Sequence, residues 1–213
     1  MKLGFFPDGI FFDLDGTLWD SVAGIAASWQ RCLARYPQFN IHFDLNDVRS
    51  CMGLCIDDIA HRLMPHLEEN LRMHLMEECL EEEHRHLREV GGEIYPHVEE
   101  TLLALKKRAP LFIVSNCEQG YIENFLEVSG FGSCFLDHIS FGDSKQQKGA
   151  NTLALIKKYG LKQPVFVGDA LVDQLAADEV QIPFIWAAYG FGKVEHYDFV
   201  IQEFCDLLAL LEN

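Results

Sequence analysis

Residues 10–20 read IFFDLDGTLWD, an apolar run followed by two closely spaced acids. The run at 10–14 predicts a buried β-strand, and Gly16 lets the chain turn sharply after it. Asp13 and Asp15 then fall at the carboxyl end of the strand, where open parallel sheets bind ligands. Two carboxylates so close together repel each other unless a cation or a shared proton intervenes. The stretch therefore predicts a hard divalent metal site, with an ordinary Asp-Gly turn as the alternative.

Four further apolar runs of strand length alternate with helical patterns along the chain. They cover residues 111–115, 165–168, 184–188 and 199–201. This alternation predicts an α/β fold with a doubly wound parallel sheet covered by helices on both faces. A chain of 213 residues, 49% of them hydrophobic, can bury one main core and carry a small insert.

Residues 19–90 carry helical patterns and no convincing strand. Apolar side chains recur at helical spacing from 22 to 33, where Asp20 or Ser21 is placed to cap the helix. Further helices are expected at 57–64 and 67–90.

Charge and glycine complete the picture of this segment. Acids at 81, 82 and 83 indicate a solvated outer face for the last helix, and Gly91 and Gly92 mark its exit. We therefore expect a helical domain of residues 19–90 inserted into a core domain of residues 1–18 and 91–213.

Two more strands end in residues suited to chemistry. Ser115 and Asn116 end the run LFIVSN and precede a helix, where they could hold phosphate oxygens or cap the helix. Asp169 ends the run VFVGD, and Asp173 follows one helical turn later. Three distant strand ends thus deliver acids or phosphate-binding groups, which a helix-dipole preference for acids explains poorly.

The sequence DLDGTL from Asp13 resembles the first motif of the haloacid dehalogenase superfamily. The serine that ends the second strand and the GDALVD sequence at 168–173 resemble later motifs of that family. The resemblance implies that Asp13 attacks phosphorus and that Asp15 acts as general acid and base. It also implies a Mg²⁺ site formed by Asp13, the backbone carbonyl of Asp15, and Asp169, with Asp173 in support or bound through water.

The resemblance also implies a lysine that neutralises phosphate and nucleophile. Lys148 is the preferred candidate because it precedes a helix, and Lys145 remains open since Gly149 replaces the usual proline. The whole chain resembles phosphoglycolate-phosphatase-like members, in which a helical cap closes over the substrate. In that cap, Arg49 and the loop around Gly53 are expected to contact the leaving group, although Arg49 could equally be an exposed arginine without a partner.

Within this family the second acid, Asp15, favours phosphate esters over the carbon–halogen substrates of dehalogenases. The absence of lysine from residues 19–90 disfavours the phosphonate hydrolases, which use a cap lysine. The expected function is Mg²⁺-dependent hydrolysis of a small phosphorylated metabolite. A phosphomutase of the β-phosphoglucomutase type and a catalytically silent binding protein remain alternatives.

Composition limits the kinds of partner and the cellular location that can be expected. A formal net charge of −16 disfavours nucleic acid and anionic membranes. Seven scattered cysteines without metal-type spacing suggest reduced thiols, and the acid-interrupted first residues fit neither a signal peptide nor a membrane span. A cytoplasmic protein is expected, and the pattern gives no oligomeric state.

Overall fold

A six-stranded sheet forms the centre of the computed structural model, which describes residues 2–212. The strand order is β5-β4-β1-β6-β7-β8, and each neighbouring pair is parallel. The strands are β1 (Ile10–Phe12), β4 (Leu111–Ser115), β5 (Asp137–Ser140), β6 (Val165–Gly168), β7 (Phe184–Ala187) and β8 (Phe199–Ile201). The predicted doubly wound parallel sheet is therefore confirmed.

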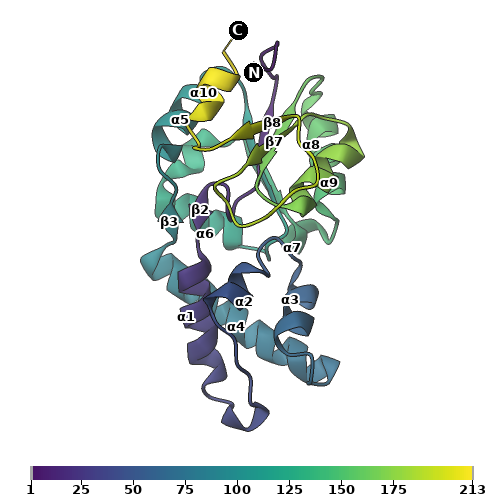
Figure 1. Cartoon of the computed structure of the whole chain (residues 1–213). Helices are drawn as coiled ribbons and strands as arrows, with labels where there is room; N and C mark the ends of the chain where they lie inside the picture. Colours follow the sequence, from purple (N-terminus) through teal and green to yellow (C-terminus); the bar gives the residue numbers. More distant parts are fainter. Residues whose placement is uncertain (1, 213) are drawn as a thin grey trace.

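Helices cover both faces of this sheet (Figure 1). They are α5 (Val98–Leu105), α6 (Tyr121–Ser129), η2 (Phe131–Cys134), α7 (Phe141–Ser144), α8 (Lys148–Tyr159), α9 (Leu171–Val180) and α10 (Asp206–Leu210). Successive side chains of a strand point to opposite faces, so Phe11 packs in a cluster with Leu155 of α8 and Ala177 of α9. Phe12 belongs to the core on the other face, together with Leu102 of α5.

A helical segment leaves the sheet domain between two short strands, β2 (Trp19–Asp20) and β3 (Glu93–Ile94), which pair antiparallel. It contains α1 (Val22–Leu33), η1 (Pro37–Phe39), α2 (Leu45–Arg49), α3 (Ile56–Leu63) and α4 (Glu69–Val90). We call the segment from α1 to α4 the helical insert; it extends from one end of the sheet domain (Figure 1). The domain boundaries expected at 18/19 and 90/91 stay a prediction, but the expectation of no strand near Trp19 is wrong.

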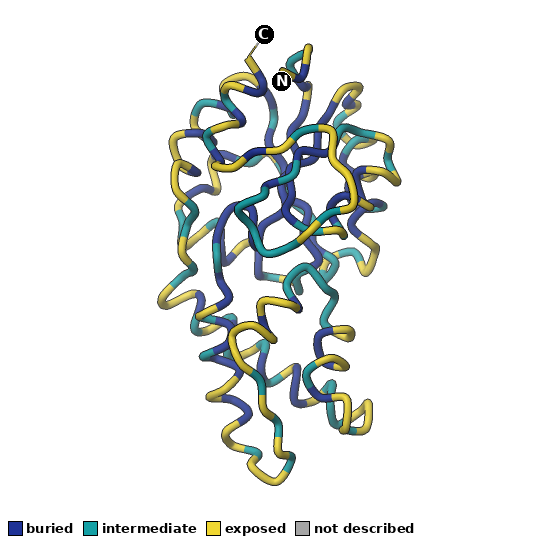
Figure 2. The backbone as a smooth tube through the Cα atoms, viewed as in Figure 1, coloured by how far each residue is buried: buried dark blue, intermediate teal, exposed yellow. Residues whose placement is uncertain are grey.

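The buried side chains of the insert join the core on one face of the sheet, and one acid lies among them. Figure 2 shows buried and exposed residues alternating along its helices, whereas the central strands are buried throughout. Trp29 of α1 is buried, and its Nε1 donates a hydrogen bond to Oε2 of Glu83 on α4 at 2.6 Å. A buried indole N–H needs an acceptor, and Glu83 supplies it. The prediction that Glu83 faces solvent is therefore wrong, whereas Glu81 is exposed.

The start of α1 shows which of the two candidate caps is used. Oδ1 of Asp20 accepts a hydrogen bond from the backbone N–H of Val22 at 3.0 Å. The Ser21 side chain makes no cap and donates to Asp15 instead.

The seven cysteines have free thiols, as the sequence predicted. Within residues 2–212, no helix has both the length and the apolar content that crossing a membrane would require.

Candidate active site

The site lies where the central strands end. β1 pairs with β4 on one side and β6 on the other, with Phe12 in register with Ile113 and Val167. Because these strands are parallel, their carboxyl ends meet at one edge of the sheet. That edge carries Asp13, Ser115 and Asp169, one residue from each of the three sequence motifs.

Three buried carboxylates form the centre of the site. One carboxylate oxygen from each of Asp13, Asp169 and Asp173 lies within 4.8 Å of the others. Burial raises the pKa of Asp13 well above its ordinary range, and the charge of Asp173 adds to that effect. Burial, and to a smaller extent the charge of Asp173, raises the pKa of Asp169 to about 7. Such a cluster is unfavourable without positive charge, and hard oxygen donors at this separation suit a divalent cation.

A buried lysine already supplies part of that charge. Lys148, the first residue of α8, is only 2% exposed. Its Nζ lies 2.7 Å from Oδ1 of Asp13 and 2.6 Å from Oδ1 of Asp173. Lys145, the alternative candidate, is exposed and pairs with Glu118 at 3.3 Å. The structure thus brings Lys148 to the predicted nucleophile and leaves Lys145 on the surface.

Backbone groups hold the two acids that follow β6. Oδ2 of Asp169 accepts hydrogen bonds from the N–H groups of Phe191 and Gly192 at 2.7 and 3.0 Å. Oδ2 of Asp173 accepts from the N–H groups of Asp169 and Ala170 at 3.1 and 2.9 Å. Each carboxylate therefore keeps its other oxygen for the centre of the site.

Gly16 permits the close approach of the first motif to Asp169. Its φ is +84°, and a Cβ built there would meet Oδ2 of Asp169 at 2.5 Å. A glycine is required at this turn for both reasons.

Asp15 is buried beside the three-acid cluster, but its side chain is bound elsewhere. Its Oδ1 accepts hydrogen bonds from Trp19 Nε1 at 2.9 Å, the Ser21 hydroxyl at 2.5 Å and the Tyr121 hydroxyl at 2.8 Å. Burial raises the pKa of Asp15, and the hydrogen bonds from Ser21 and Tyr121 oppose this rise. The expected metal contact of Asp15 is its backbone carbonyl, and that contact stays a prediction.

The second motif links the sheet edge to the helical insert. Ser115 and Asn116 are buried, and Nδ2 of Asn116 donates to the carbonyl oxygen of Gly53 at 2.8 Å. Oδ1 of Asn116 is buried and has no hydrogen-bond partner among residues 2–212. The structure therefore brings three of the four expected substrate-binding residues to the site.

Arg49, the fourth, lies elsewhere. Its guanidinium is 3.6 Å from Oδ2 of Asp20 and 5.6 Å from the centre of the Phe191 ring. Arg49 is not among the residues that line the pocket at Asp13. This placement gives no support to the expected contact between Arg49 and the leaving group.

A pocket opens from the sheet edge towards the insert. The sheet domain contributes Asp13, Asp15, Ser115, Asn116, Cys117, Glu118 and Tyr121. The insert contributes mainly apolar side chains, together with Glu83 and His84 of α4. The pocket therefore extends from Asp13 of the acid cluster to a mainly apolar wall.

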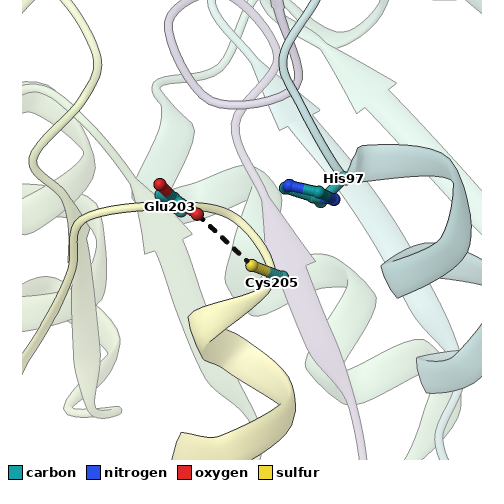
Figure 3. Close-up of side chains that lie close together, drawn as sticks. All are labelled: His97, Glu203 and Cys205. Atoms are coloured by element: carbon teal, nitrogen blue, oxygen red, sulfur yellow. Dashed lines mark hydrogen bonds between the residues drawn. The ribbon is translucent and has the colours of Figure 1, made fainter.

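A second group of possible metal ligands lies outside this pocket. Figure 3 shows His97, Glu203 and Cys205 around a common space, with the outer ring nitrogen of His97 turned towards the other two. His97 and Glu203 are exposed, and none of the three lines the pocket at Asp13. Of these two groups in the described part of the chain, only the buried acid cluster, through Asp13, adjoins that pocket.

Comparison with known proteins agrees with this geometry. Residues 10–187 match the model of the haloacid dehalogenase-like hydrolases, and the chain belongs to that family. This assignment confirms the resemblance seen in the motifs and the prediction that the chain is a hydrolase.

The similar proteins cover nearly the whole chain. The phosphoglycolate phosphatase of Vibrio cholerae is 30% identical over 225 residues, which are 95% of this chain and 96% of that protein. The phosphoglycolate phosphatase of Yersinia pseudotuberculosis is 29% identical over 216 residues, 95% of this chain and 92% of that protein. A crystal structure of a predicted phosphoglycolate phosphatase from Haemophilus somnus has a TM-score of 0.85 and 26% identity, and covers 96% of this chain and 98% of that one.

Several residues of the site were missed by the sequence analysis. Tyr121 and Ser21 reach Asp15 from α6 and from the start of α1; no local pattern marks Tyr121, and Ser21 was considered only as a helix cap. Glu83 and His84 sit in a run of charged residues that was interpreted as a solvent-facing surface. The N–H groups of Phe191 and Gly192 bind Asp169, and the sequence analysis gave neither residue a role in the site.

Proposed function

We propose that this chain is a Mg²⁺-dependent phosphatase that hydrolyses a small phosphorylated metabolite through a phosphorylated Asp13. The observation that carries the proposal is the cluster of Asp13, Asp169 and Asp173, with Lys148 bonded to Asp13, at the carboxyl edge of a parallel sheet. The similarity to phosphoglycolate phosphatases supports the same class of reaction.

Mg²⁺ fits the donor set. The carboxylates of Asp13 and Asp169 and the backbone carbonyl of Asp15 would hold the ion, and Asp173 would support it directly or through water. When bound, the ion would neutralise charge on the phosphate and on the carboxylates.

The protein groups account for both chemical steps. A carboxylate oxygen of Asp13 attacks phosphorus while the bond to the leaving oxygen breaks, and Asp15 protonates that oxygen. Asp15 then takes a proton from water, the water oxygen attacks phosphorus, and the bond to Asp13 breaks to release inorganic phosphate. The bonds from Trp19, Ser21 and Tyr121 to one oxygen of Asp15 hold its carboxyl group in place.

The remaining groups position phosphate. Lys148 orients Asp13 and offsets negative charge, since its ammonium is fixed between two acids. The Ser115 hydroxyl and the Asn116 backbone N–H are suited to phosphate oxygens.

The helical insert would act as a cap over this centre. The hydrogen bond from Asn116 to Gly53 ties it to the sheet edge, and closure of a cap would exclude bulk water while the phosphorylated intermediate forms. In this proposal the cap comprises residues 19–90.

The direct experiment measures phosphate release from p-nitrophenyl phosphate with Mg²⁺, with EDTA and with Asp13→Asn. We expect turnover only for the wild type with a divalent ion. A silent binding protein would give no turnover under any condition, and a phosphomutase would interconvert sugar phosphates faster than it released phosphate.

A further inference from the structure

The wall that the helical insert contributes to the pocket is apolar. Seven hydrophobic side chains form it: Ile25, Trp29, Met52, Leu54, Ile56, Ile59 and Leu80. The substrate's phosphate would occupy the polar end at Asp13, so its leaving group would lie along this wall. An apolar wall favours an apolar body, because burial of apolar surface is favourable and unpaired charge is costly there.

No arginine or lysine lines the pocket anywhere in residues 2–212. Lys148, which contacts Asp13, is already paired with Asp13 and Asp173. Arg49 of the insert is paired with Asp20 outside the pocket. A leaving group with a carboxylate would therefore find no free cation along the wall.

An acidic side chain makes such a group still less favourable. Glu118 borders the same pocket; its Oε2 pairs with Lys145, whereas its Oε1 is buried without a hydrogen-bond partner among the described residues. An anion placed beside Oε1 would be repelled in a site of low dielectric. The pocket therefore disfavours negative charge on the leaving group both along its apolar wall and at Glu118.

The polar groups on the insert side are suited to neutral partners. Nε2 of His84 is buried and lacks a hydrogen-bond partner within the described residues. Burial lowers the pKa of His84, and burial raises the pKa of Glu83 to about 8, so both are largely uncharged at neutral pH. A hydroxyl or carbonyl group on the substrate could satisfy His84 without bringing a charge.

We propose that the preferred substrate is the phosphate monoester of an uncharged, largely apolar alcohol, with 2-phosphoglycolate and other anionic esters strongly disfavoured. The proposal rests on the phosphatase function above and names the leaving group at the same site. It also distinguishes the substrate of this chain from phosphoglycolate, the compound in the names of the similar phosphatases.

The test compares three alkyl phosphates with Mg²⁺: isobutyl phosphate, 2-phosphoglycolate and O-phosphoethanolamine. Each releases an alcohol, and they differ in the charge that faces the wall. We expect isobutyl phosphate to give the highest kcat/KM of the three and to exceed 2-phosphoglycolate by at least about tenfold, since an anion without a cationic partner loses its solvation in the pocket.

A variant should weaken the preference. Met52→Arg places a cation on the wall at a half-buried position, and Met52→Leu is its matched control. The arginine should lower the ratio of kcat/KM for isobutyl phosphate to that for 2-phosphoglycolate by about tenfold, and the leucine should leave it unchanged. Leu54→Arg, at another half-buried position, serves if Met52→Arg does not fold.

The outcomes separate the two proposals. Hydrolysis of all three esters with a charged ester ahead, or an unchanged ratio in a folded arginine variant, overturns the leaving-group inference alone. No Mg²⁺-dependent hydrolysis of any phosphomonoester overturns the phosphatase proposal, and the inference with it.

Discussion

Replacing Lys148 with methionine tests the electrostatics of the site through folding stability. Methionine keeps most of the apolar stem but removes the ammonium that contacts Asp13 at 2.7 Å and Asp173 at 2.6 Å. Removing one partner of a buried ion pair costs about 3–5 kcal/mol. We expect the lower end of that range at pH 7 without metal, because one of the two acids can take up a proton.

The assay is urea unfolding followed by circular dichroism in EDTA, with Lys145→Met as the matched control. Lys145 is exposed and pairs with Glu118, so its replacement should cost at most about 1 kcal/mol. Adding Mg²⁺ should recover part of the stability lost in Lys148→Met, since the ion supplies charge to the same acids. A loss no larger than that of Lys145→Met would refute the account of Lys148 as the buried counter-charge.

Three further substitutions probe the rest of the site. Because burial raises the pKa of Glu83 to about 8 from an ordinary 4.5, the folded protein keeps a proton that the unfolded chain has released, and stability falls as pH rises through this window. Relative to the wild type, the free energy of unfolding of Glu83→Gln, measured with urea, should thus rise by on the order of 1 kcal/mol per pH unit between pH 5 and 8. A difference between the two proteins that does not change with pH would contradict this. Asn116→Ala removes the hydrogen bond to Gly53 and should raise KM roughly fivefold, which corresponds to about 1 kcal/mol of binding free energy. An unchanged KM would contradict this expectation. Gly16→Ala should lower stability by about 1–3 kcal/mol and abolish phosphatase activity, because its Cβ meets Asp169; an active, stable variant would show that this contact is tolerated.

Features set by local sequence could be predicted. The strands ending in Asp13, Ser115 and Asp169 are continuous apolar runs, and a parallel sheet necessarily gathers their carboxyl ends at one edge. β5 was not predicted, because this edge strand reads DHIS and only Ser140 of it is buried.

Features set by contacts between distant segments could not be predicted. Glu83 is buried because Trp29, 54 residues earlier, needs a hydrogen-bond acceptor. Tyr121 reaches Asp15 across 106 residues of sequence. Arg49 was expected at the leaving group, but its pairing with Asp20 depends on how α2 packs against α1, which begins two residues after Asp20. In each of these cases the partner of the side chain depends on tertiary packing, which the local sequence pattern does not predict.

The central claim is that Asp13 carries phosphate during turnover. Acid quenching of the enzyme during Mg²⁺-dependent hydrolysis of p-nitrophenyl phosphate, followed by mass spectrometry of its peptides, tests this directly. The nitrophenolate of this substrate leaves without a proton, so Asp15→Asn should slow mainly the second step and increase the yield of phosphorylated enzyme. The account predicts covalent phosphate on the peptide that contains Asp13 and on no other. Undiminished turnover by Asp13→Asn, or phosphate on a different residue, would contradict it.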